Sequence, residues 1–233
     1  MKKILGIDEA GRGAVVGPLV IAGAMFYEKD IPKLKALEVR DSKELTPKKR
    51  EYLENEIKRL ALDFVVIRIS ANKIDELRET RNLNRIEMDY MADIIKTLRP
   101  DVAIIDSPEV NTEKIKNEIL GKLKDLEVEI IAENYADKKY PVVSAASILA
   151  KVVRDRAIKS LEERLGEEIG VGYPSDERTI KFLKRVLDKY KGYPEFVRKS
   201  WTTSQRLKGE KSQKNLSNFL VKSKSGDEEK EGK

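Results

Sequence analysis

Two short apolar runs that each end in an aspartate are the feature that most constrains how this chain folds. The first is Ile4–Asp8 (ILGID) and the second is Val102–Asp106 (VAIID). Their length and abrupt ends are typical of buried strands. Strand alternation places Asp8 on the face opposite Leu5 and Ile7. If the two strands are parallel neighbours, both aspartates meet at the carboxyl edge of the sheet, where open α/β sheets bind ligands.

The rest of the pattern interleaves helices with strands. Apolar residues at helical spacing predict helices over residues 47–62, 83–98 and 141–161, and a helix-like segment after the second aspartate reaches about Leu123. Thr46 is a candidate cap for the first of these helices, with Pro47 in its first turn. Strands are predicted over residues 18–27, 64–69 and 128–132. An opening antiparallel pair followed by alternating elements predicts a mixed α/β sheet of five strands.

The chain is expected to have three parts. Residues 1–175 carry all the predicted strands and form the main domain. Residues 176–206 predict two helices, broken at Gly192-Tyr193-Pro194, that make a small helical C-terminal lobe. Residues 207–233 are polar, rich in Lys and Glu, and nearly aperiodic, which predicts a disordered tail.

Composition excludes several kinds of chemistry. The 233 residues include no Cys and no His, which rules out thiol catalysis, imidazole catalysis and zinc–thiolate sites. Acid–base or metal chemistry must therefore use Asp and Glu. A net charge of +6 is compatible with an anionic partner. Asp8 and Glu9 end the first apolar run too early for a secretion signal, and no run approaches membrane-spanning length. We therefore expect a soluble, cytoplasmic monomer that does not contact a membrane.

A glycine-flanked arginine follows the first pair of carboxylates, with Glu9 expected to begin the turn. Gly11 and Gly13 allow positive φ and close approach to a ligand, and the N–H groups of such turns bind anions. A divalent cation between the carboxylates and a bound phosphate would explain why the two features adjoin. Asp and Glu are also ordinary turn residues after a strand, so the motif alone leaves both interpretations open.

A series of motifs in a fixed order favours the functional interpretation. The motifs are DEAGRG (residues 8–13), DSK (41–43), DS (106–107), AD (136–137), SAAS (144–147) and GYPSD (172–176). The series resembles ribonuclease HII, the type 2 ribonuclease H family, over residues 4–206. The resemblance implies a ribonuclease H-like fold with helices on both faces of the sheet. It also implies an endoribonuclease that hydrolyses the RNA strand of RNA–DNA hybrids and cuts at ribonucleotides embedded in duplex DNA.

The resemblance further implies a cluster of four carboxylates that bind metal and catalyse the reaction: Asp8, Glu9, Asp106 and Asp137. Like charges in such a cluster raise one another's pKa, and a divalent metal relieves the repulsion. Mg²⁺ is the expected ion, with Mn²⁺ able to replace it. Two such ions would activate water and stabilise the leaving oxygen, so that the products carry a 3′-hydroxyl and a 5′-phosphate. Taken alone, Asp106 is better explained as a turn or helix cap, and Asp137 as a turn residue.

The same resemblance implies how the substrate is recognised. The turn of Gly11, Arg12 and Gly13 would read the 2′-hydroxyl, the group that separates RNA from DNA. Tyr173 would stack on the following deoxyribose, although taken alone it is better explained as a half-buried core aromatic.

Contacts with backbone phosphate are expected from two further places. Ser42 and Lys43 match the family's Asp-Ser-Lys motif, although a solvated approach to a helix is the alternative. The C-terminal lobe carries basic residues that are candidates for gripping a duplex, although most such faces are merely solvated. These residues are Lys181, Lys184, Arg185, Lys189, Arg198 and Lys199.

One segment departs from the family pattern. Residues Glu133–Asp137 read ENYAD, where the family commonly has EHKAD. Asn134 in place of histidine removes no metal ligand. It leaves open any role in proton shuttling or product release that belongs to the histidine.

The tail contains a candidate peptide for binding the DNA sliding clamp. Its expected anchors are Gln213, Leu216, Phe219 and Leu220, whose spacing puts three apolar side chains on one side of a single helical turn. The last anchor is Leu rather than a second aromatic residue. A tail that folds back on the body is the alternative.

Two other functions compete with the hybrid-cutting ribonuclease. One is another nuclease of the same fold, such as a junction resolvase or a transposase-like enzyme, which would need no 2′-hydroxyl. The other is a non-catalytic adaptor for nucleic acid or the clamp, which would show no metal-dependent cutting.

Overall fold

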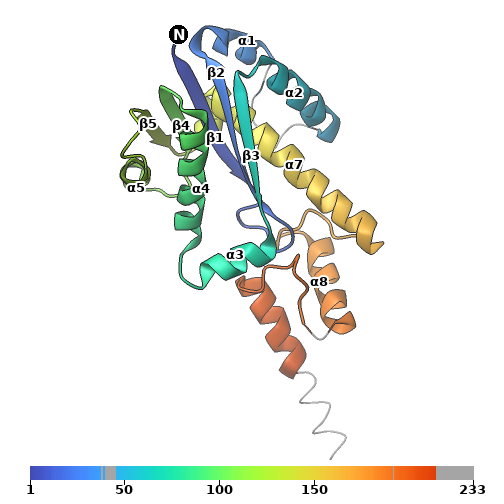
Figure 1. Ribbon diagram of the computed structural model, residues 1–233. Helices are drawn as coiled ribbons and strands as arrows, with labels where there is room; N and C mark the ends of the chain where they lie inside the picture. The colour runs from blue at the N-terminus through green and yellow to red at the C-terminus, as the bar shows by residue number, and fades with distance from the viewer. Residues whose placement is uncertain (38, 40–45, 191, 214–233) are drawn as a thin grey trace, which may run out of the picture.

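A mixed five-stranded sheet in the order β3-β2-β1-β4-β5 forms the centre of the protein (Figure 1). The computed structural model describes residues 1–37, 39, 46–190 and 192–213. The strands are β1 (Lys3–Ala10), β2 (Leu19–Tyr27), β3 (Asp63–Ile69), β4 (Val102–Asp106) and β5 (Glu129–Glu133). The helices are α1 (Ile31–Ala36), α2 (Pro47–Leu60), α3 (Ala71–Arg78), α4 (Leu83–Leu98), α5 (Thr112–Lys122), α6 (Ala136–Lys139), α7 (Pro141–Leu165), α8 (Glu177–Lys189) and an unlabelled helix over residues 202–213.

The central strand β1 has one antiparallel and one parallel neighbour. It pairs antiparallel with β2 and parallel with β4, where Ile7 lies opposite Ile105. β3 extends the antiparallel side and β5 the parallel side. The predicted fold class, a mixed five-stranded sheet flanked by helices, is therefore confirmed.

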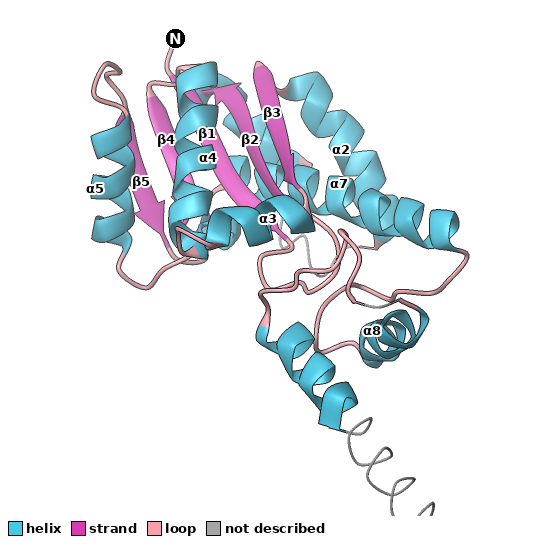
Figure 2. Ribbon diagram, turned by 60° about the horizontal axis from the view of Figure 1, so that its bottom comes forward, coloured by secondary structure: helices cyan, strands magenta, loops and turns pink. Residues whose placement is uncertain are grey.

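Helices cover both faces of the sheet (Figure 2). Leu5 and Ile7 pack into the apolar cluster formed with α4 and α5, whereas Ile4 packs into the cluster formed with α1, α2 and α7. Gly6 faces α7 so closely that an added Cβ would lie 2.1 Å from the carbonyl oxygen of Val142. The absence of a side chain at Gly6 therefore lets the buried start of α7 rest directly on β1.

Local sequence signals set several of the helix ends. The Thr46 hydroxyl accepts a hydrogen bond from the Lys49 N–H at 3.3 Å, which caps α2 as predicted. The Asn82 side chain caps α4 by accepting from the Arg85 N–H at 2.9 Å. α4 ends at Leu98, and the next residue, Arg99, has a left-handed φ of 49°.

Strand β1 is longer than expected, and this corrects the position of Glu9. The antiparallel ladder with β2 continues through Glu9, which pairs with Ile21, to Ala10. Glu9 therefore belongs to the strand and does not begin the turn. Helix α3 was also not predicted; Ser70 caps it by accepting from the Lys73 N–H at 3.2 Å.

The C-terminal part contains α8 and the helix over residues 202–213 (Figure 2). The expected tail boundary at residue 207 is wrong, because the described part of that tail, residues 207–213, is helical. Leu207 is buried in a third apolar cluster together with Phe182 and Val186 of α8. Tertiary packing therefore extends a helix that its polar composition did not predict. Among the described residues, no helix is long and apolar enough to cross a membrane.

Candidate active site

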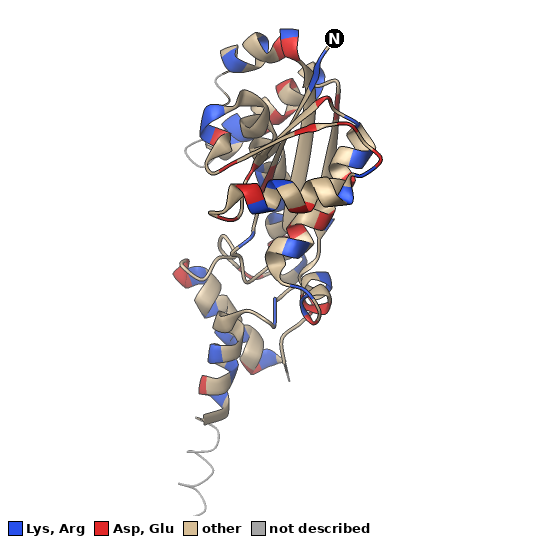
Figure 3. Cartoon of the chain, turned by 90° about the vertical axis from the view of Figure 1, so that its left-hand side faces the viewer, with Lys and Arg blue, Asp and Glu red and all other residues tan. Residues whose placement is uncertain are grey.

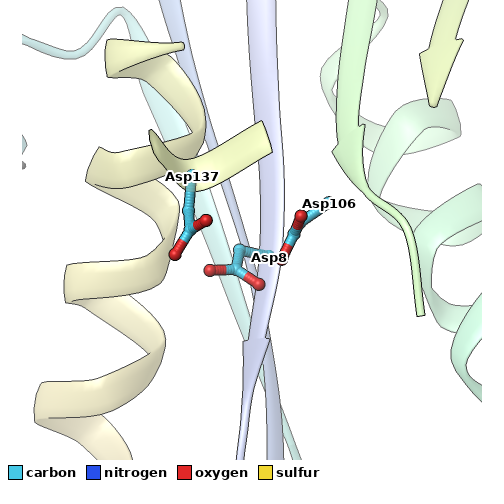
Figure 4. Close-up of side chains that lie close together, drawn as sticks. All are labelled: Asp8, Asp106 and Asp137. Carbon is cyan, nitrogen blue, oxygen red and sulfur yellow. The ribbon is translucent and has the colours of Figure 1, made fainter. Parts of the chain in front are cut away.

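Three aspartates from distant parts of the chain converge at the carboxyl edge of the sheet. Asp8 comes from β1, Asp106 ends β4, and Asp137 lies in α6, and their carboxylate oxygens lie within 4.8 Å of one another. Figure 4 shows Asp8 between the other two. Asp8 and Asp106 meet because β1 and β4 are parallel neighbours, as the sequence predicted.

Backbone and hydroxyl groups fix these aspartates. The Ala136 N–H donates to Asp106 Oδ1 at 2.8 Å, which ties the start of α6 to the end of β4. The Ser144 hydroxyl of α7 donates to the carbonyl oxygen of Asp137. The fold therefore holds the Asp106 carboxylate and the Asp137 backbone in place.

The cluster is electrostatically unfavourable without a cation. Burial and the neighbouring carboxylate of Asp106 raise the pKa of Asp8 from 3.8 to about 7, although a hydrogen bond with Ser147 opposes the shift. Two of the three side chains, Asp8 and Asp137, are buried. The donor set consists of carboxylate oxygens, which hard divalent cations prefer. The residues present therefore fit a divalent metal ion.

Glu9 lies outside the group of three aspartates whose oxygens lie within 4.8 Å of one another, so its place in the predicted four-carboxylate cluster stays a prediction. Because side chains alternate along a strand, Glu9 points toward α4 instead. There, burial and the carboxylate of Glu87 raise the pKa of Glu9 well above its usual value. Glu9 Oε2 is buried and has no hydrogen-bond partner in the described part of the chain. Glu9 nevertheless lines the same pocket as Asp8 and Asp106.

The glycine-flanked turn forms the wall of this pocket, whose volume is about 410 Å³. The Gly11 N–H donates to the hydroxyl of Tyr173 at 3.0 Å, so two motifs lying 162 residues apart meet. Gly11 has a φ of 88°, which favours glycine. Gly13, in contrast, has no left-handed φ, and the expectation of positive φ there is wrong. Gly13 is exposed, and an added Cβ would meet nothing within 4 Å.

Arg198 supports the turn through hydrogen bonds to its backbone. Its guanidinium donates to the carbonyl oxygens of Gly11 at 2.7 Å, Arg12 at 2.9 Å and Gly17 at 3.3 Å. Burial and the nearby charge of Arg154 lower the pKa of Arg198 to about 9. Since Arg198 is fully buried, the expectation that it grips a duplex is wrong. Three of its N–H groups are committed to backbone carbonyl oxygens within residues 11–17.

Arg154 of α7 supports Tyr173. Its guanidinium lies 4.6 Å from the centre of the Tyr173 ring and donates to the carbonyl oxygen of Val171 at 2.9 Å. A Cβ on Gly11 would lie 2.4 Å from Arg154 Nε, so this position requires glycine for steric reasons as well. The tyrosine, the turn and α7 therefore form one packed unit.

Several residues of the site were missed or given other roles from the sequence. Ser147 and Lys151 line the pocket from α7, one turn apart on the same helix face. A lysine four residues after the small-residue motif was a usable signal. No pattern distinguished Arg154 and Arg198 from the many solvated basic residues.

Some predicted residues cannot be placed. Ser42 and Lys43 lie outside the described residues, as do Leu216, Phe219 and Leu220 of the tail. Gln213 is the last described residue of the final helix.

Comparisons with known proteins agree with this geometry. The family model described as ribonuclease HII matches residues 5–204. Ribonuclease HII of Methanothrix thermoacetophila is 44% identical over 211 residues, covering 89% of this chain and 98% of the relative. Ribonuclease HII of Methanothermobacter thermautotrophicus is 48% identical over 210 residues, covering 88% and 99%.

Solved structures with a similar fold include two type 2 ribonucleases H. Ribonuclease H2 from Pyrococcus horikoshii OT3 superposes with a TM-score of 0.83 at 39% identity, covering 89% of this chain and 98% of that chain. Ribonuclease HII in its complex with PCNA from Archaeoglobus fulgidus superposes with a TM-score of 0.79 at 40% identity, covering 85% and 95%. The chain therefore belongs to the ribonuclease HII family, the divalent-metal-dependent type 2 ribonucleases H that act as endoribonucleases on RNA–DNA hybrids.

Proposed function

We propose that this enzyme also cuts at single ribonucleotides embedded in duplex DNA, and that it uses two divalent metal ions. The observation that carries the proposal is a single pocket that brings together Asp8, Asp106 and the turn around Arg12. A group that reads one sugar must lie beside the metal centre that cuts the adjacent phosphodiester. The hydrogen bond between Gly11 and Tyr173 supports this arrangement.

Asp8, Asp106 and Asp137 would hold the metal, with Glu9 completing the set from the opposite face of β1. The buried, unpartnered Glu9 Oε2 supports that role, because such an oxygen costs stability unless a ligand satisfies it. Mg²⁺ is the proposed ion and Mn²⁺ a substitute, since both accept carboxylate oxygens. When bound, two such ions supply an activated water and stabilise the leaving 3′ oxygen.

Gly13 supports the sugar-reading role of the turn. Neither its backbone conformation nor its surroundings within the described protein require glycine. The missing side chain therefore serves something outside the fold, and close approach of a ribose explains it. The 2′-hydroxyl both donates and accepts hydrogen bonds, which suits recognition by backbone groups.

The bound duplex would extend from the pocket toward the C-terminal helices. Basic and acidic residues are interspersed over the molecule rather than gathered in one stripe (Figure 3). Of the candidate residues in the lobe, Arg185 and Lys189 form ion pairs with Glu167. Exposed Lys184 and Lys199 keep their ammonium groups available for phosphate, and Lys43 stays a candidate.

The sliding clamp is a proposed partner. A ribonuclease HII that is 40% identical was solved in a complex with PCNA. In this chain the candidate peptide begins at Gln213, where the described final helix ends. Leu216, Phe219 and Leu220 would be its anchors in a groove of the clamp.

A glycine substitution tests the sugar-reading role without disturbing the fold. Gly13→Ala should leave the melting temperature unchanged but reduce cleavage at a single embedded ribonucleotide by about tenfold or more, because the new methyl group blocks the sugar. Gly121→Ala is the matched control, since a Cβ there also meets nothing within 4 Å. Cleavage would be measured with Mg²⁺ and with chelator, beside an all-DNA duplex. Normal cleavage by Gly13→Ala, or metal-dependent cutting of the all-DNA duplex, would contradict the proposal.

A further inference from the structure

The side chain of Arg12 leaves the turn and lies on α4. Its Nε donates to Glu87 Oε2 at 3.0 Å, and its Nη2 donates to Asn84 Oδ1. Asn84 and Glu87 lie three residues apart, on the same face of the helix. Glu87 is fully buried, whereas 38% of the Arg12 side chain is exposed. One edge of the guanidinium is therefore committed to α4.

Asn84 also contacts the loop that follows Asp106. The Asn84 Nδ2 donates to Glu109 Oε1. The Glu109 carboxylate also pairs with Lys114 at 3.2 Å. The Ser107 hydroxyl donates to the carbonyl oxygen of Glu109 at 2.8 Å, which closes the loop on itself. The turn and the end of β4 are thus joined through a single side-chain amide.

Asn134 ties the same loop to the segment before Asp137. Its Nδ2 donates to the carbonyl oxygens of Glu109 at 2.8 Å and Ser107 at 3.3 Å. The asparagine that departs from the family pattern therefore has a direct structural task in this chain. Hydrogen bonds therefore connect the turn, through Asn84 and Glu109, to the segments that carry Asp106 and Asp137.

We infer that Asn84 is a positioning residue that fixes the spacing between the sugar-reading turn and the strand end that carries Asp106. This inference rests on the proposed function of the turn. An amide is needed at this point because it accepts through oxygen and donates through nitrogen. Arg12 requires the acceptor and Glu109 requires the donor. A carboxylate at position 84 keeps the first contact and turns the second into a repulsion.

An exchange of donor and acceptor tests this reasoning. Asn84→Asp should reduce kcat/KM for a duplex with one ribonucleotide by about 10- to 100-fold, mainly through kcat, because a shift of about 1 Å in a reacting group can cost that much. Adding Glu109→Gln should restore kcat/KM to within about threefold of the wild type, since the amide of Gln can donate to the new carboxylate. Arg85→Ala, an exposed neighbour on α4, is the control and should cleave normally.

Two further measurements separate positioning from general damage. Mn²⁺ binding by titration calorimetry should weaken in Asn84→Asp and recover in the double variant, while thermal unfolding shows that each variant is folded. Equal kcat/KM for Asn84→Asp and the wild type would overturn the inference. So would a folded double variant that cleaves no better than Asn84→Asp.

A third variant distinguishes failure of this inference from failure of the proposed function. If Arg12→Ala cleaves normally, the turn does not read the sugar and the proposed function fails. If Arg12→Ala is impaired while Asn84→Asp is not, only the positioning role fails. When both are impaired, the Arg12→Ala/Asn84→Asp double variant should lose less than the sum of the two single losses, because the spacing that Asn84 fixes matters only while Arg12 is in place. Additive losses would contradict the inference.

Discussion

Replacing Asp8 with Asn should stabilise the metal-free protein at neutral and alkaline pH. Burial and the carboxylate of Asp106 raise the folded-state pKa of Asp8 from 3.8 to about 7. Between these values the folded protein keeps a proton that the unfolded chain has released, so the stability of the wild type falls as pH rises through this window. At 1.36 kcal/mol per pKa unit, the full loss is about 4 kcal/mol. Asn carries no titrating proton and escapes this loss.

The assay is thermal unfolding in chelator between pH 4 and pH 8. The two proteins should differ little near pH 4, and by pH 8 Asp8→Asn should melt roughly 10 °C higher, at about 2–4 °C per kcal/mol for a chain of this size. Mg²⁺ or Mn²⁺ should reverse the order, because only the wild type gains metal-binding energy. Asp93→Asn, an exposed carboxylate on α4, is the matched control. Parallel pH profiles for wild type and Asp8→Asn in chelator would refute the account of a buried, mutually repelling cluster.

Two further outcomes follow from the C-terminal part of the chain. Arg198→Lys keeps a positive charge but cannot reach the carbonyl oxygens of Gly11, Arg12 and Gly17 together. We therefore expect cleavage, measured by steady-state kinetics, to fall about tenfold and the melting temperature, measured by calorimetry, to fall by a few degrees. Unchanged kinetics would show that Arg198 does not support the turn. Ending the chain after Gln213 retains the packed helix over residues 202–213, so cleavage of RNA–DNA hybrids should stay normal. Affinity for the clamp, measured by surface plasmon resonance, should be lost. Undiminished clamp binding would place the binding peptide elsewhere.

The meeting of Asp8 and Asp106 could be predicted from local patterns, whereas Asp137 followed only from the family resemblance. Apolar runs of strand length located β1 and β4, and their parallel adjacency brought Asp8 and Asp106 together. Glu9 was misplaced for a local reason too. The glycines after it indicated a turn, whereas the ladder with β2 holds the strand through Ala10. Because the strand continues through Glu9, alternation places its side chain on the α4 face.

The residues that support the site could not be predicted, because their partners are distant. Arg198 contacts carbonyl groups 181 to 187 residues away, and in sequence it looks like its exposed neighbour Lys199. The residues around Leu207 are mostly polar, so the sequence there shows no helical periodicity. The burial of Leu207 against α8 decides that the helix continues. Tertiary contacts of this kind override local composition.

Within the part of the chain that the structure describes, buried polar atoms without a hydrogen-bond partner are concentrated around the turn at Gly11. In the described chain, buried side-chain atoms without a hydrogen-bond partner belong to Glu9, Glu87, Arg154 and Tyr193. Three of these residues surround the turn at Gly11, where Glu87 holds Arg12 and Arg154 holds Tyr173. Each such atom costs about 1–3 kcal/mol, so a fold selected for stability alone would have paired or removed them. Their concentration around one turn fits a region whose polar atoms are completed by bound water, metal or substrate, which offset this cost.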